Sequence, residues 1–98
     1  MALLHLLATP AEIARNVGAN VKQLRLARNL SRKSLADRAG VSESSIKRLE
    51  ASGSISLEAL ILVALALNEV GQVAGLFNAM PPRSLEELKN AGRKRGMR

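Results

Sequence analysis

The sequence predicts an all-α fold, with one compact domain of five helices followed by a short basic tail. Leu, Ala, Ile and Val dominate its apolar residues and β-branched runs are few, which favours helices over strands. Apolar residues recur at helical spacings, and a Ser or Thr precedes most of these segments as a cap. A chain of 98 residues makes one domain. We expect an apolar arm at 1–8, the helical domain at 9–80 and the tail at 81–98.

The first predicted helix begins at Pro10. Thr9 and Glu12 form a capping box around this start, and proline is favoured at the first helical position. The helix runs to about Asn29, and Gly18 weakens its middle, where the helix can bend. Its predicted inner stripe, with spacings of four, four and three, consists of Ile13, Val17, Val21 and Leu24.

Two short helices follow and meet at a glycine turn. Ser31 caps the second helix, which ends at Gly40 because glycine accepts the left-handed conformation of such a turn. Ser42 caps the third helix, at about 43–51, and the Ser-Gly-Ser segment at 52–54 ends it.

The two sides of this third helix differ in character. At about 100° per residue, Ile46 and Leu49 fall together with Val41, and we expect them to pack on Leu35 and Ala36 of the second helix. The opposite arc is short-chained near its start and basic further along, and it consists of Glu43, Ser44, Lys47, Arg48 and Ala51. Small residues allow a close approach to DNA and long donors then reach base edges, so this face is typical of a helix that enters a major groove.

The remaining helices are more apolar. Ser56 caps a fourth helix at 57–67 that is apolar on almost every side. Since so small a monomer can hardly bury all of that surface, we expect one face in the core and the other at a subunit or partner interface. A fifth helix at 69–78 is marginal because it contains two glycines, and 84–87 predicts a last turn or two.

Composition excludes several functional classes. The chain has no cysteine, so it can form neither a disulfide framework nor a thiolate metal site. A single histidine, His5, cannot build a metal site or a catalytic triad alone. We find no nucleophile–base pair and no glycine-rich phosphate loop, and we therefore expect neither enzyme activity nor a cofactor. The net charge of +7 indicates a polyanionic partner, nucleic acid before others.

No segment of the sequence is typical of targeting or membrane insertion. The arm at 1–8 has no basic region before it and is too short for a signal peptide or a span. The longest uncharged apolar window, 59–67, has about half the length that a span requires. We expect a soluble, cytoplasmic protein without a membrane partner.

The helix pair and its flanks carry a long motif. It runs through LRLARNLSRKSLADRAGVSESSIKRLE at 24–50 and SLEAL at 56–60. The residues that match are Leu24, Arg25, Arg28, Leu30, Ser31, Leu35, Ala36, Ala39, Gly40, Val41, Ser42, Ile46, Leu49 and Glu50. With this spacing, residues 21–67 resemble the Cro/repressor-type (XRE-type) helix-turn-helix family of DNA-binding proteins. The resemblance implies a Cro/repressor-like domain in which the third helix is the recognition helix.

The resemblance also implies roles for single residues. By position it places Glu43, Ser44 and Arg48 where the family reads bases, with Lys47 and Ser42 nearer the phosphates. It implies an ion pair between Arg25 and Glu50 that braces the first helix against the third. The family usually has Gln where this chain has Arg32, so the backbone contact there becomes a charged one, and we expect Lys33 beside it to contact phosphate as well.

Simpler roles stay open for two of the base-reading candidates. Arg48 can be a solvated cation. Glu43 is repelled by phosphates unless it accepts a hydrogen bond from a cytosine amino group, and it can instead favour the amino terminus of its helix.

One recognition helix reads only a few base pairs, which is too little for a selective site. Two copies related by a twofold axis read half-sites about one helical turn apart. We therefore expect a homodimer on a palindromic operator in double-stranded DNA. The arm at 1–8 could extend the same interface.

The tail at 81–98 carries six Lys or Arg against two Glu. It is a solvated chain end, a source of further phosphate contacts, or a segment that orders on a partner protein. With Phe77, Pro81-Pro82 and SLEEL at 84–88, this ending is similar to that of small antitoxins paired with kinase-type toxins. That resemblance implies a repressor of its own operon that binds a toxin encoded beside it.

Three hypotheses follow from the sequence. The first is a dimeric, sequence-specific repressor, with or without a toxin partner. The second is an interaction module that mainly neutralises a partner protein. The third is a non-specific nucleic-acid binder driven by charge alone.

Overall fold

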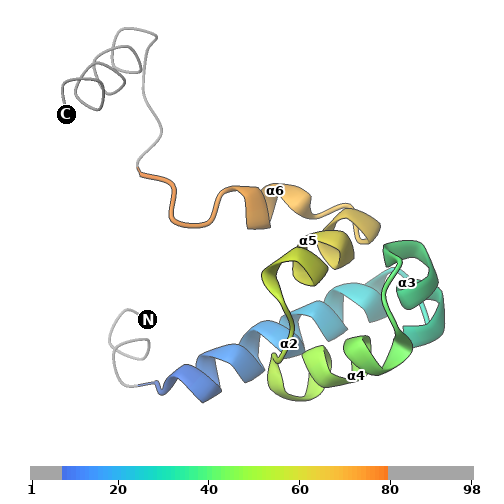
Figure 1. Cartoon of the computed structure of the whole chain (residues 1–98), viewed down its shortest axis with the longest axis horizontal. Helices are drawn as coiled ribbons and strands as arrows, with labels where there is room; N and C mark the ends of the chain where they lie inside the picture. The colour runs from blue at the N-terminus through green and yellow to red at the C-terminus, as the bar shows by residue number, and fades with distance from the viewer. Residues whose placement is uncertain (1–7, 80–98) are drawn as a thin grey trace, which may run out of the picture.

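The computed structural model describes residues 8–79 (Figure 1). This part of the chain forms α2 (Pro10–Ala27), α3 (Arg32–Ala39), α4 (Glu43–Ser52), α5 (Leu57–Ala66) and α6 (Val70–Ala74), and it contains no strand. The predicted all-α class is confirmed. The expectations for the arm at 1–7, including His5, and for the tail at 81–98 lie outside the described residues.

The first four helices begin where the sequence predicts, because a hydroxyl caps each start. Each capping oxygen accepts a hydrogen bond from the backbone N–H three residues along, at 3.0–3.1 Å. The four caps are Thr9, Ser31, Ser42 and Ser56. Satisfying one free N–H at each start fixes where the chain turns into the helix.

The helices α2, α3 and α4 end just before residues that adopt a positive φ. Gly40 ends α3 at φ +73° and Gly53 ends α4 at φ +77°, as the sequence predicts. The first helix ends at Ala27 and not at Asn29, because Asn29 itself lies in the left-handed region at φ +55°. The prediction for the last described helix was too long, since Gly75 follows the five residues of α6 directly.

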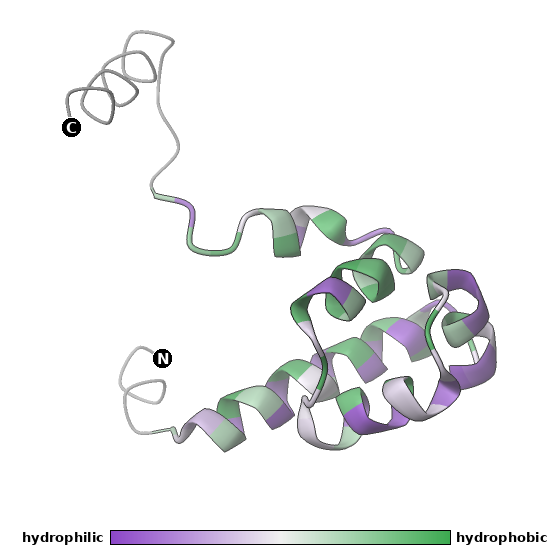
Figure 2. Ribbon diagram, in the orientation of Figure 1, coloured by the Kyte–Doolittle hydropathy of each residue, from purple (hydrophilic) through white to green (hydrophobic). Residues whose placement is uncertain are grey.

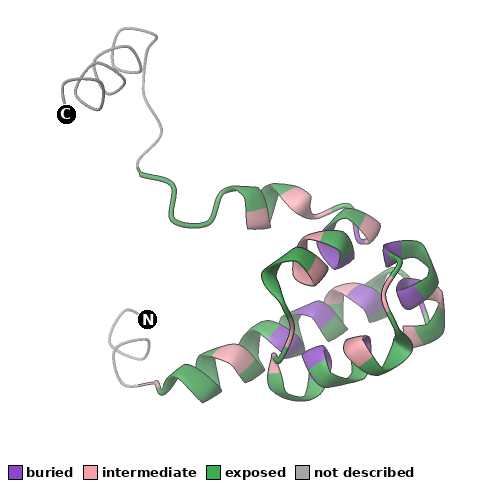
Figure 3. Cartoon of the chain, viewed as in Figure 1, coloured by how far each residue is buried: buried purple, intermediate pink, exposed green. Residues whose placement is uncertain are grey.

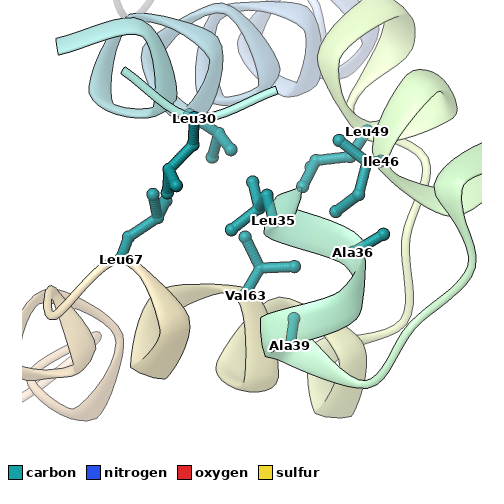
Figure 4. Packing of buried hydrophobic residues seen from close by; sticks show 9 residues of the cluster. Leu30, Leu35, Ala36, Ala39, Ile46, Leu49, Val63 and Leu67 are labelled. Atoms are coloured by element: carbon teal, nitrogen blue, oxygen red, sulfur yellow. The ribbon is translucent and has the colours of Figure 1, made fainter. Parts of the chain in front are cut away.

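The core lies where α3 meets α4 and α5. Leu35 of α3 lies between Ile46 and Leu49 of α4 on one side and Val63 of α5 on the other (Figure 4). All four side chains are fully buried. Leu30 and Leu67 extend the same cluster toward the end of α2. The predicted packing of the third helix on the second is confirmed.

The predicted inner stripe of the first helix is only half right. Val21 is buried and Leu24 is partly buried, but Ile13 and Val17 are 45% and 39% exposed. The end of α4 reaches α2 only as far as Ala14, where Gly53 packs on it, so the turn of α2 that contains Ile13 extends beyond the other helices (Figures 1 and 3). Val17 lies further along and lines an apolar groove shared with α5 and α6, which leaves it partly open. Helical periodicity identifies a face, but not how far along the helix a partner reaches.

Gly18 has a packing role that the sequence did not reveal. The helix continues through it from Pro10 to Ala27. A Cβ placed on Gly18 would lie only 2.0 Å from the carbonyl oxygen of Leu49. The glycine therefore allows the backbones of α2 and α4 to approach each other closely, and α2 packs mainly on α4.

Among residues 8–79 no single helix has the length and apolar composition needed to cross a membrane. Only α4 and α5 taken together, across a bend of 101°, meet both criteria.

Candidate nucleic-acid interface

Burial of one face of α4 determines which face is free. Ile46 and Leu49 are fully enclosed by the core, so the arc on the other side of the helix points away from it. The side chains on that arc are all exposed, and they are Glu43, Ser44, Lys47, Arg48 and Ala51 (Figure 3). The structure thus brings the three candidate base-reading residues and Lys47 onto one surface. Their contacts with DNA stay predictions.

Three hydroxyl groups gather at the start of α4. The Ser42 oxygen accepts the backbone N–H of Ser45 at 3.1 Å, which caps the helix. It also lies 3.1 Å from the hydroxyl of Ser44 and 2.8 Å from that of Ser45. Ser42, a candidate phosphate contact, therefore already has a structural role, and its hydroxyl is held in place by that role.

The ion pair that the family resemblance implies is present and buried. Arg25 Nε donates to Glu50 Oε2 at 2.6 Å, and its Nη2 donates to Oε1 at 3.1 Å. The remaining terminal nitrogen of Arg25 donates to the carbonyl oxygen of Leu30 at 2.7 Å. The two side chains are only 7% and 2% exposed. This bidentate pair ties α2 to α4 and also holds the loop that follows α2.

Glu50 is kept in its charged form by its partners. Burial alone would raise the pKa of this carboxyl group. The hydrogen bonds and positive charges of Arg25 and Arg32 outweigh burial and hold the pKa below its ordinary value of 4.5. The carboxylate is therefore a permanent anchor at neutral pH.

Arg32 takes part in the same cluster, which sequence reasoning missed. Its Nε donates to Glu50 Oε1 at 3.0 Å, and its side chain is 39% exposed. The one signal in the sequence was a charged residue where the family usually has Gln. Lys33, the next residue of α3, is exposed, and no ion pair joins it to another residue within 8–79.

A groove of about 330 Å³ lies beside Arg48, between α4 and the start of α5. It is lined mainly by hydroxyl and small side chains, namely Ser45, Ser54, Ile55, Ser56 and Ala59. The sequence did not indicate that the residues before α5 would adjoin Arg48, because that proximity depends on the turn at Gly53.

Charge is divided between two parts of the described chain. Residues 8–53 contain nine Lys or Arg and four Asp or Glu, whereas 54–79 contain two Glu and no basic residue. Figure 2 shows the corresponding change from the largely hydrophilic α3 and α4 to the mostly apolar α5. The basic residues thus lie on the part of the chain that carries the candidate interface.

Comparison with known proteins agrees with this geometry. A family model described as helix-turn-helix matches residues 21–71, from the second half of α2 into α6. No curated protein matches the chain significantly. The matched region is just over half of the chain and contains the α3–turn–α4 pair with its core. The chain therefore belongs to the Cro/repressor-type (XRE-type) helix-turn-helix family of DNA-binding transcription regulators.

Proposed function

We propose that this protein is a sequence-specific transcriptional repressor that binds a palindromic operator as a homodimer. One observation carries the proposal: the exposed face of α4 combines Glu43, Ser44 and Arg48, while the buried face holds that helix rigidly in the core. A helix presented in this way fits the major groove of B-form DNA.

Each residue of the face suits a different part of the duplex. Arg48 carries the donor pair that matches the two acceptors of guanine, and Glu43 can accept from the amino group of cytosine. Ser44 is short enough for the helix to come close to the base edges. Phosphate contacts are assigned to Arg32, Lys33, Ser42 and Lys47, and these set position without specifying sequence.

The exposed leucines of α5 support dimerisation. Leu57, Leu62 and Leu65 are 62%, 37% and 54% exposed, and Leu65 lies between the other two around the helix, about 80° from Leu57 and about 60° from Leu62. Exposed leucines clustered on one helix are unusual on a small monomer and suit a subunit interface. A twofold dimer would carry two α4 helices to half-sites about 34–36 Å apart.

Autoregulation as an antitoxin stays a prediction. Of the residues that suggest it, only Phe77 lies within the described part of the chain, and its ring is fully exposed. An exposed aromatic side chain suits a protein partner, whose identity would come from the reading frame beside the gene.

Operator selection tests the proposed function. Full-length protein is used to select sites from random double-stranded DNA, and affinity for the selected site is compared with a scrambled duplex at several salt concentrations. We expect an inverted repeat, two chains per site and a preference of about 4–10 kcal/mol over the scrambled duplex. Equal affinity for both duplexes with the same salt slope would establish the charge-driven binder instead.

A further inference from the structure

Three helices meet at one carboxylate. Glu50 belongs to α4, and its two partners come from different helices, Arg25 from α2 and Arg32 from α3. Arg25 is buried with Glu50, whereas Arg32 lies at the surface end of the cluster with 39% of its side chain exposed. The cluster contains two positive charges and one negative charge, so one positive charge is left over.

The hydrogen bonds divide the carboxylate between the two arginines. Glu50 Oε2 accepts from Arg25 Nε, and Oε1 accepts both from Arg25 Nη2 at 3.1 Å and from Arg32 Nε at 3.0 Å. The two arginines therefore hold the end of α4 from two directions. Glu50 is two residues from Arg48 on the same helix, so fixing Glu50 restricts rotation of the whole exposed face.

We propose that Arg32 is a positioning residue for α4: through Nε it holds Glu50, and with it the orientation of the DNA-reading face, while its terminal nitrogens are left to bind a DNA phosphate. This inference rests on the proposed function for its DNA half only. The link between Arg32 and α4 exists in the protein alone.

The guanidinium group is suited to both tasks at once. It is planar and carries five N–H donors in a fixed fork, so one edge can donate to a carboxylate while the other faces an anion. A lysine ammonium is a compact charge on a flexible stem and cannot make the same pair of contacts. A phosphate bound to Arg32 would neutralise the surplus positive charge without leaving Glu50 unpaired, because Arg25 remains bidentate.

Three variants of the full chain separate the roles. Arg32→Lys keeps the charge but removes the Nε–H, Arg32→Ala removes both, and Lys33→Ala removes a neighbouring exposed cation that has no ion pair within 8–79. Affinity for the selected operator and for a scrambled duplex is measured over a range of salt.

Each variant has its own expected result. Lys33→Ala weakens binding to both duplexes equally. It also makes the slope of log affinity against log salt concentration shallower by about 0.9, the value for one phosphate contact. Arg32→Lys keeps the salt slope but lowers the operator-to-scrambled ratio about threefold to tenfold, as loss of a half-exposed charged hydrogen bond would do. Arg32→Ala lowers both the slope and the ratio. An unchanged ratio in both Arg32 variants overturns the positioning role and leaves a plain phosphate contact.

A DNA-free measurement keeps the two proposals apart. The pKa of Glu50 is measured by following the NMR chemical shift of its carboxyl carbon with pH, in the parent and in Arg32→Ala, with Lys33→Ala as control. We expect the pKa of Glu50 to rise in Arg32→Ala and to stay unchanged in the control, because Arg32 donates a hydrogen bond to that carboxylate and Lys33 does not. If no duplex is bound selectively, the proposed function fails, and an unshifted Glu50 in Arg32→Ala then overturns this inference separately.

Discussion

Among the acidic side chains within residues 8–79, Glu50 is the one that is buried while ionised, so its stability depends most on the groups around it. Removing one partner from a buried pair leaves the other charge uncompensated, which costs more than the pair contributes when intact. Glu50→Ala is therefore expected to lower the free energy of unfolding by about 3–5 kcal/mol. Chemical denaturation measures this loss, with Glu58→Ala, at an exposed position in the first turn of α5, as the control. A loss no larger than that of the control would show that the guanidinium group of Arg25 becomes solvated by water when Glu50 is removed.

The same residue predicts how stability depends on pH. Its folded-state pKa lies below the ordinary value of 4.5, so the unfolded chain takes up the proton first as the solution is acidified. The contribution of Glu50 is thus complete above pH 4.5 and is lost as the pH falls through the lowered pKa. Melting temperatures measured from neutral to acidic pH should fall less steeply in Glu50→Gln than in the parent. Parallel curves would contradict the assigned pKa direction.

Arg48 and Lys47 are neighbours on the exposed face with different expected roles. Arg48→Ala is expected to cost about 1–3 kcal/mol on the operator and to relax specificity at one position in each half-site. Lys47→Ala should weaken operator and scrambled DNA alike, because a phosphate contact carries no sequence information. Binding measured on operators substituted at single positions distinguishes them. An equal loss on random DNA for Arg48→Ala would remove its base-reading role.

At the scale of helices, the contact between α2 and α4 depends on a missing side chain. Gly18→Ala places a methyl group against the backbone of α4, which cannot move aside as a flexible side chain would. We expect a destabilisation of about 1–3 kcal/mol, the usual effect of overpacking. Gly71→Ala is the matched control, because its Cβ would have no atom within 4 Å and should stabilise by about 0.4–1 kcal/mol. Thermal unfolding of both variants gives the comparison, and equal shifts would contradict the close packing.

The helices show which features a sequence can predict. Ser31, Ser42 and Gly40 act on residues three or four positions away, so local patterns located the starts and ends of α3 and α4. The exposed face of α4 followed from periodicity for the same reason. Gly18 and Arg32 act on residues of other helices, Leu49 and Glu50, and no local pattern reports such distances. Ile13 and Val17 were misplaced because periodicity shows neither where a neighbouring helix stops nor how closely it packs.

At the scale of the whole molecule, the contribution of the basic tail at 81–98 to DNA binding can be measured by deletion. Deleting residues 83–98 removes six Lys or Arg and two Glu. If the tail contacts phosphates, binding to every duplex weakens and the salt slope becomes shallower, because fewer counterions are released. A full-length variant with those six cations replaced by Gln controls for length. An unchanged slope in both would leave the tail as a solvated end or as a segment for a protein partner.

The separation of basic residues from α5 and α6 also affects how the molecule meets DNA. The described chain has a positive part, 8–53, and a part without any basic residue, 54–79. In the field of a polyanion, this asymmetry within residues 8–79 adds a torque that favours turning α3 and α4 toward the duplex, while the six cations of the tail at 81–98 add to the attraction. Fewer encounters with DNA would then end in an orientation in which α4 cannot reach the major groove.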